Sequence, residues 1–288
     1  MYIFKRLVLN PISMSYLKLL YVAFITVLLI TSNTANSQNI ILSNGYAHND
    51  YWHKRPLFDA LDKGFTYVEA DVFLKGDKLV VAHYFLSKKN RTLEELYLKP
   101  LLNYVEENRK REHWINDYPI TLMIDIKSNA NKTYEALELL LKKYKSILSG
   151  YEDGQLKLKN VTIILTGHKP NDILTKRTNR LVFMDDNLKN LGKDSSNHFY
   201  KTASCKYNNL LKWKGKGSIP EIDRKRLEYY VTKAHLQGKK VRLWASPENK
   251  AVWAELLRCN VDLINTDKLG ELRNFLISEL SLTANQYD

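Results

Sequence analysis

Short apolar runs alternate with amphipathic segments from about residue 40 onward. The runs are rich in branched and aromatic residues and lack a strict alternation of apolar and polar positions, which is typical of parallel strands buried on both faces. The sixth run is the least regular, because Tyr200 to Ser204 is short and polar. We expect eight strands, near residues 40–47, 66–73, 120–126, 161–166, 181–184, 200–204, 240–244 and 262–265.

Between these runs, apolar residues recur at three- and four-residue spacing, which predicts amphipathic helices. Gly76 and Asp77 mark a tight turn, so we expect the second strand to continue into a hairpin that returns to His83. Strands that alternate with helices predict a (β/α)8 TIM barrel, and a chain of this length suits one such domain. The expected helices span residues 56–63, 92–109, 133–148, 223–237 and 248–258.

The first 37 residues follow a different pattern. Basic residues precede an apolar run from Leu19 to Ile30, and residues 31–37 are small and polar. This order is typical of a secretory signal peptide, and we place its cleavage after Ser37. A retained membrane anchor is the weaker alternative, because a spanning helix needs roughly 20 apolar residues. We therefore expect residues 1–37 to be a signal peptide, residues 38–288 to form the barrel, and the mature protein to be secreted or periplasmic.

Composition and charge narrow the classes of function. A hydrophobic content of 44% suffices for a large core and excludes a disordered chain. The formal net charge of +13 favours anionic substrates or surfaces, although a solvated lysine-rich surface gives the same balance. We expect no nucleic-acid binding, because the lysines are dispersed and no basic-aromatic motif occurs. Cys205 and Cys259 are too few for a disulfide framework and leave one bridge open.

Two carboxylates interrupt the second expected strand. Glu69 and Asp71 stand two residues apart among apolar neighbours, so their side chains share one face of the strand. Burying two like charges side by side is costly unless a cation neutralises them, and carboxylate oxygens suit Mg²⁺ or Ca²⁺. This segment predicts a site for one divalent cation; a solvated strand end is the alternative.

The third expected strand carries a similar interruption. Asp125 follows a run of apolar residues, and Lys127 comes two positions later on the same face. If this strand lies beside the second, Asp125 completes the metal site and Lys127 faces a substrate anion. The alternative is a simple ion pair between Asp125 and Lys127 at the barrel rim.

Two histidines follow strand ends, His48 after the first strand and His83 after the hairpin. Catalytic groups of such barrels collect at the carboxyl ends of the strands. Imidazole titrates near neutral pH, so one histidine can remove a proton while the other donates one. Each alone could be structural, but two histidines with three acids on consecutive strands favour an active site.

At this point the sequence resembles a family, the superfamily of glycerophosphodiester phosphodiesterases and phosphatidylinositol-specific phospholipase C. Residues 241–245 and 261–267 look like the last two strands of that family, so the resemblance spans roughly residues 44–270. The motifs that carry it, in order, are His48-Asn49-Asp50, Glu69-x-Asp71, Val81-Ala82-His83 and Asp125-x-Lys127. The resemblance implies that the two histidines are catalytic, that the three acids hold a divalent cation, and that the lysine touches phosphate.

The sequence also departs from that pattern. Asn49-Asp50 stands where the pattern has Arg-Gly, and Leu57-Phe58-Asp59 replaces its Glu-Asn-Thr, so a phosphate-binding arginine is missing. Asp125 instead of glutamate, together with Asn49, is closer to the sphingomyelinase D branch. A poorly characterised branch with His-Asn-Asp-Tyr and Leu-Tyr-Leu-x-Pro-Leu is the most similar, matched by residues 48–51 and 96–101. The resemblance therefore does not identify the substrate of this chain.

The sequence thus predicts a metal-dependent phosphodiester hydrolase or lyase that acts on a glycerophosphodiester or a phospholipid head group. We expect Asn49, Lys127 and Arg242 to contact substrate, and Trp244 to be either a pocket wall or barrel core. The nucleophile is water or a hydroxyl of the substrate, which would give a cyclic phosphate. A transient contact with an anionic membrane surface fits the basic charge. The alternative from another class is a noncatalytic barrel that binds phospholipid head groups or sugar phosphates.

Overall fold

The computed structural model describes residues 40–87, 90–110, 119–192 and 198–284. The expected signal peptide lies outside these residues. Eight parallel strands of the described chain form the barrel wall in the order β10-β9-β8-β7-β4-β2-β1-β11. They are β1 (Leu42–Ala47), β2 (Phe65–Lys75), β4 (Ile120–Ile126), β7 (Val161–Gly167), β8 (Phe183–Asn187), β9 (Tyr200–Lys206), β10 (Lys240–Trp244) and β11 (Ile264–Thr266).

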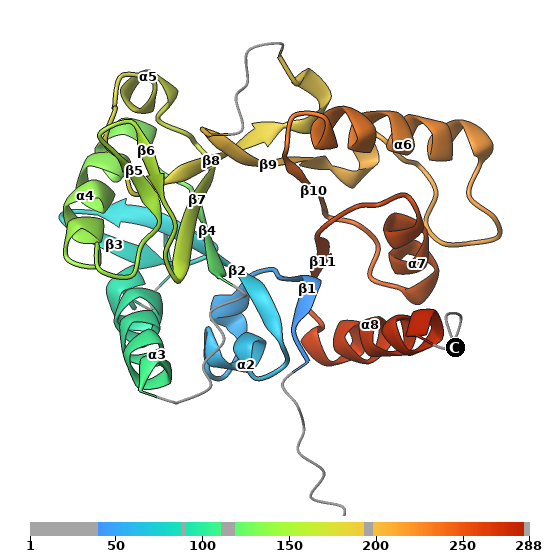
Figure 1. Cartoon of the computed structure of the whole chain (residues 1–288), viewed down its shortest axis with the longest axis horizontal. Helices are drawn as coiled ribbons and strands as arrows, with labels where there is room; N and C mark the ends of the chain where they lie inside the picture. Colours follow the sequence, from blue (N-terminus) through green and yellow to red (C-terminus); the bar gives the residue numbers. More distant parts are fainter. Residues whose placement is uncertain (1–39, 88–89, 111–118, 193–197, 285–288) are drawn as a thin grey trace, which may run out of the picture. The chain divides into compact units, whose positions relative to one another are not determined.

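The two ends of this strand order meet. Arg242 and Leu263 form a parallel bridge, and the Leu263 amide donates to the Val241 carbonyl at 3.0 Å. The expected TIM barrel and its eight strands are therefore confirmed. Figure 1 shows the strands around a ring, with the larger helices outside it. The predicted hairpin is also present, because β3 (Lys78–Val81) pairs antiparallel with β2 across the turn at Gly76 and Asp77.

The connections contain the expected helices, with shifted ends. The helix predicted to start at residue 133 begins at Ala130, because the Asn129 side chain caps it by accepting the Lys132 amide at 3.1 Å. The hairpin of β5 (Gly150–Glu152) and β6 (Gln155–Lys157), the helix α5 and the helix α8 were not predicted. The helices are α2 (Phe58–Leu61), η2 (Glu94–Leu98), α3 (Lys99–Arg109), α4 (Ala130–Lys142), α5 (Asn171–Leu174), α6 (Glu221–His235), α7 (Lys250–Arg258) and α8 (Leu269–Ala284). Among the described residues, no helix is both long and apolar enough to cross a bilayer.

The barrel interior is layered. Its amino-terminal layer is an apolar cluster of Tyr46, Tyr67, Met123, Ile164, Phe183 and Leu263. Because side chains on a strand alternate in direction, the next inward position lies two residues further toward the carboxyl end. On β2, β4 and β8 these next positions are Glu69, Asp125 and Asp185. The apolar layer therefore forms a floor beneath a polar layer at the carboxyl ends of the strands.

Both cysteines are buried and free, so the bridge left open by the sequence is absent. Burial raises the pKa of Cys205 to about 12 and that of Cys259 to about 11. Neither thiol is suited to nucleophilic chemistry, since the thiolate is the reactive form.

Candidate active site

The two carboxylates of β2 are buried side by side at the barrel mouth. Asp71 lies opposite Asp125 in the register of β2 with β4, so the two strands are neighbours, which was the condition set in the sequence analysis. Glu69 and Asp71 are each only 2% exposed, and Asp125 is partly buried. The structure therefore brings the three predicted acids to one end of two neighbouring strands.

Glu69 is held by an arginine from the far side of the barrel. Arg242 Nη1 lies 2.9 Å from Glu69 Oε1, which also accepts the Tyr46 hydroxyl at 3.0 Å. Burial by itself would raise the pKa of Glu69, but the charge of Arg242 outweighs it and holds that pKa below its ordinary value. The guanidinium stacks on the Tyr46 ring, with 4.3 Å between its central carbon and the ring centroid. Arg242, predicted to contact substrate, is thus buried and engaged with Glu69.

Asp71 and Asp125 share a lysine. Lys127 Nζ lies 2.6 Å from Asp125 Oδ2 and 3.5 Å from Asp71 Oδ2, so the rim ion pair considered from the sequence is present. Burial and the neighbouring charge of Glu69 raise the pKa of Asp71 to about 6, and burial raises that of Asp125. Asp125 Oδ1 is buried without a hydrogen-bond partner. In this cluster three carboxylates contact two basic side chains, Lys127 and Arg242.

His48 is oriented by an acid from the last strand connection. Its Nδ1 lies 2.7 Å from Asp267 Oδ1, so Nδ1 carries the proton and donates it to the carboxylate. Its Nε2 lies 3.4 Å from Glu69 Oε2. Burial by itself would lower the pKa of His48, but the hydrogen bond to Asp267 and the charge of Glu69 outweigh it and raise that pKa. His48 therefore presents Nε2 to the acidic cluster.

The turn after β1 fixes this histidine. Asn49 adopts the left-handed conformation (φ 47°), which asparagine tolerates better than most residues. The buried Asp50 accepts the Leu57 amide at 2.5 Å and the Tyr97 hydroxyl at 2.9 Å. The chain around Leu57, which itself has φ 68°, is thereby tied to the turn. The Asn49 Oδ1 atom lies 2.9 Å from the Tyr51 hydroxyl oxygen, so hydrogen-bonding contacts link the residues of this motif.

His83 lies beside Asp71. The distance from His83 Nδ1 to Asp71 Oδ2 is 3.1 Å, and the Tyr51 hydroxyl donates to the same oxygen at 2.9 Å. The ring packs edge-to-face against Trp52 and Tyr84, with centroids 5.3 and 4.4 Å away. His48 and His83 thus contact neighbouring carboxylates of one strand, Glu69 and Asp71 respectively. This arrangement suits an acid–base pair acting on one bound group.

Four further residues of this mouth were missed by the sequence analysis. Asp267 orients His48, Tyr46 donates to Glu69, and Tyr51 joins Asn49 to Asp71. The buried Asp185 of β8 accepts the Thr202 hydroxyl at 2.6 Å and that of Ser204. An acid in an apolar strand is a signal that could have identified Asp185, and Asp267 follows the last strand as His48 follows the first. The tyrosines gave no signal beyond their apolar neighbours.

Trp244 ends β10 at the mouth and is 38% exposed, which fits a pocket wall rather than barrel core. The Lys206 ammonium lies 5.7 Å from the centroid of its ring. Among the described residues, no group of three or more histidine, cysteine or acidic side chains is arranged to hold a metal ion. The three acids supply oxygen donors, but basic side chains contact each of them.

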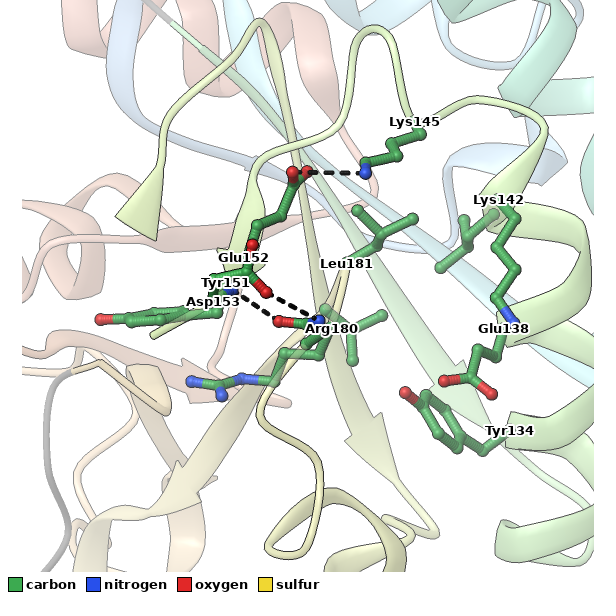
Figure 2. A pocket seen from close by; sticks show the side chains of 12 residues that line it. Tyr134, Glu138, Lys142, Lys145, Tyr151, Glu152, Asp153, Arg180 and Leu181 are labelled. Atoms are coloured by element: carbon green, nitrogen blue, oxygen red, sulfur yellow. Dashed lines mark hydrogen bonds and ion pairs between the residues drawn. The ribbon is translucent and has the colours of Figure 1, made fainter. Parts of the chain in front are cut away.

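A cavity of about 210 Å³ lies away from this mouth (Figure 2). In Figure 2, Tyr134 and Glu138 from α4 lie on one side, and Tyr151 and Arg180 lie on the other. Arg180 precedes β8 and exchanges backbone hydrogen bonds with Tyr151, so this cavity is at the amino ends of the strands. Catalytic groups of parallel barrels gather at the opposite end, and we assign this cavity no part in the active site.

Comparisons with known proteins show the family to which the chain belongs. Residues 34–185 match the model of the AIM6-like phosphodiesterase domain, and residues 240–270 match that of the glycerophosphoryl diester phosphodiesterase family. Altered inheritance of mitochondria protein 6 from Eremothecium gossypii is 30% identical over 272 residues, covering 82% of this chain and 70% of the relative. The protein of the same name from Lachancea thermotolerans is 29% identical over 293 residues, covering 84% of this chain and 67% of the relative.

Among solved structures, a calcium-dependent phosphoinositol-specific phospholipase C from a Pseudomonas species superposes with a TM-score of 0.53. The match covers 79% of this chain and 89% of that chain, at 15% sequence identity. At this identity the likeness concerns the fold, and it supports the TIM barrel.

Proposed function

Because the chain belongs to the family of AIM6-like phosphodiesterase domains, within the superfamily of glycerophosphodiester phosphodiesterases and phosphatidylinositol-specific phospholipase C, we propose that it cleaves phosphodiesters by metal-assisted acid–base catalysis. The substrate is a glycerophosphodiester or a phospholipid head group. One observation carries the proposal: His48 and His83 contact adjacent carboxylates of a three-acid cluster at the carboxyl ends of the strands.

The chemistry of the three acids at the mouth suits one divalent cation, although basic side chains contact each of them here. Glu69, Asp71 and Asp125 are the residues that would hold it, and carboxylate oxygens are what Mg²⁺ and Ca²⁺ prefer. Asp125 Oδ1 is buried without a hydrogen-bond partner, and burial together with the charge of Glu69 raises the pKa of Asp71, so a further cation would be favourable here. When bound, such a cation offsets the charge that develops on a nonbridging phosphate oxygen.

The histidines move the protons. With Nδ1 hydrogen-bonded to Asp267, His48 exchanges its proton at Nε2, and His83 likewise has Nε2 left when Nδ1 faces Asp71. One histidine removes a proton from the nucleophile, and the other protonates the leaving oxygen. The nucleophile is water or a hydroxyl of the substrate itself. We propose that Lys127 and Asn49 bind the phosphate of the substrate. The Lys127 side chain is about one-third exposed and so can reach it.

Asp267 gives a test of the orientation of His48. In Asp267→Asn, the amide no longer offers a charged acceptor, so the pKa of His48 should fall and its tautomer should be less fixed. We expect turnover to drop at least about tenfold, and the limb of the pH–rate profile that belongs to His48 to move to lower pH. The pH profile of kcat/KM checks this. A profile that coincided with wild type, whatever the rate, would remove Asp267 from the mechanism.

We also propose a transient contact with anionic membrane surfaces. Four large side chains beside His83 are exposed, and we call them the aromatic rim: Trp52, Tyr84, Phe85 and Leu86, of which Leu86 is 88% exposed. Contiguous exposed apolar groups on a soluble domain mark an interaction surface, and tryptophan and tyrosine suit the interface between water and lipid. The positive net charge attracts anionic lipid.

Leu86→Glu places a charge in this rim without touching the histidines. We expect it to reduce sedimentation with phosphatidylglycerol vesicles about fivefold or more and to leave turnover of a soluble phosphodiester unchanged. The matched control is Leu236→Glu, which changes an equally exposed leucine just after α6. Equal vesicle binding by the two variants would reject the rim as a membrane contact.

A further inference from the structure

A second hollow opens at the carboxyl ends of β8, β9 and β10, with a volume of about 310 Å³. Its walls come from the ends of these strands and from the short turns η3 (Leu188–Asn190) and η4 (Tyr207–Asn209). We call it the basic pocket, and the residues that matter below are Lys189, Asn190, Lys206, Asn209 and Trp244. It lies at the mouth, at the same end of the barrel as His48 and His83.

The basic pocket borders the proposed catalytic centre. Trp244 stands two residues after Arg242 on one face of β10, and Arg242 contacts Glu69 at 2.9 Å. On β9, the lining residue Ser204 donates its hydroxyl to Asp185, inside the barrel. A phosphodiester carries two alcohols, so a phosphate held beside Glu69 can extend one of them toward this side of the mouth.

The charges of the basic pocket are unbalanced. Lys189 and Lys206 are exposed, and neither forms an ion pair with an acidic side chain of the described residues. Two ammonium groups lining one hollow repel each other, and an anion placed between them relieves that repulsion. The carboxamides of Asn190 and Asn209 add donors and acceptors suited to hydroxyl groups. The lining therefore fits a ligand that is both anionic and hydroxylated.

Trp244 excludes a competing class of ligand. An exposed tryptophan face could hold the quaternary ammonium of choline by a cation–π contact. Here the Lys206 ammonium already lies 5.7 Å from the ring centroid, so a second cation would meet a like charge. The same ring face remains suited to the C–H groups of a sugar or cyclic polyol.

We propose that the basic pocket binds the head-group alcohol of the substrate, and that this alcohol is a polyol with an anionic group of its own, such as a second phosphate. The inference rests on the proposed phosphodiesterase function and narrows its substrate class to anionic head groups. Lys189 and Lys206 contact the extra anion, and Trp244 packs on the polyol ring. Neutral and cationic head groups, choline among them, lack this anchor.

Binding measured by calorimetry on the full chain tests the pocket without requiring turnover. The probes are inositol 1,4-bisphosphate, inositol 1-phosphate and phosphocholine. We expect wild type to prefer the bisphosphate over the monophosphate by at least about tenfold, and Lys189→Met/Lys206→Met to lose that preference, because each charged hydrogen bond contributes appreciably to affinity. The control Lys157→Met/Lys225→Met removes the same charge at exposed lysines outside the pocket.

The outcomes separate the two hypotheses. An unchanged preference in Lys189→Met/Lys206→Met, at a melting temperature equal to wild type, overturns the basic pocket even if phosphodiesters are cleaved. Tighter binding of phosphocholine than of the bisphosphate overturns it as well. Loss of the preference in Lys189→Met/Lys206→Met but not in the control variant supports the pocket. If the wild type then cleaves no phosphodiester, the proposed function fails while the binding site stands. If the double variant unfolds, Lys206→Met alone carries the same comparison.

Discussion

Replacing His48 or His83 with alanine should lower turnover by about 10²- to 10⁴-fold, the usual contribution of a positioned proton donor or acceptor. The expectation follows from their contacts, since each histidine lies beside a different acid of β2 and keeps one ring nitrogen for proton exchange. Both side chains are partly exposed at the mouth, so the melting temperature should change little. Turnover of a phosphodiester panel and thermal unfolding of the same samples provide the measurement.

The double variant adds a sharper criterion. Groups that act in one reaction are strongly non-additive, so His48→Ala/His83→Ala should lose much less than the product of the two single losses. His235→Ala is the matched control, because His235 of α6 pairs with Asp262 outside the mouth. A single variant that kept more than about half of wild-type turnover would remove that histidine from the mechanism. Full binding of head groups without any turnover in wild type would favour the noncatalytic barrel.

Removing the divalent cation should abolish activity. We expect a chelator to stop turnover and added Mg²⁺ or Ca²⁺ to restore it. The charges of Lys127 and Arg242 do not balance those of Glu69, Asp71 and Asp125, and a bound phosphate adds further negative charge that a cation would neutralise. Asp71→Asn should weaken ion binding at least about tenfold. The fold should remain intact, since the substitution takes a like charge from a buried acidic cluster and relieves its repulsion.

Calorimetric titration of wild type and variants with each ion checks the assignment. Asp77→Asn serves as the control, because Asp77 is an exposed acid of the hairpin turn that follows β2. Equal ion affinity in wild type and Asp71→Asn would defeat the proposed ligands, and activity that persisted in chelator would defeat metal dependence. The rescue by Mg²⁺ and by Ca²⁺, compared side by side, identifies the preferred ion.

The sequence by itself determined the strands and the acids they carry. Alternation along a strand is a local property, so Glu69 and Asp71 had to share a face, as did Asp125 and Lys127. The buried parallel strands could be recognised in the sequence because a sheet covered on both faces requires nearly continuous apolar runs. The order of strands and helices then left few architectures, and the barrel followed. The order of motifs supplied the superfamily.

Only the tertiary structure decided what surrounds these residues. Asp267 contacts His48, 219 residues away in sequence, because β11, the last strand, pairs with β1, the first. Closure of the barrel also carries Arg242 of β10 to Glu69 of β2, where the two side chains form a buried ion pair. Such partners come from strands far apart in the sequence. Their spacing along the chain depends on the lengths of loops and helices, which the periodicity of a single strand or helix does not reveal. The basic pocket also depends on the tertiary structure, since β8, β9 and β10 bring their carboxyl ends together only by pairing side by side.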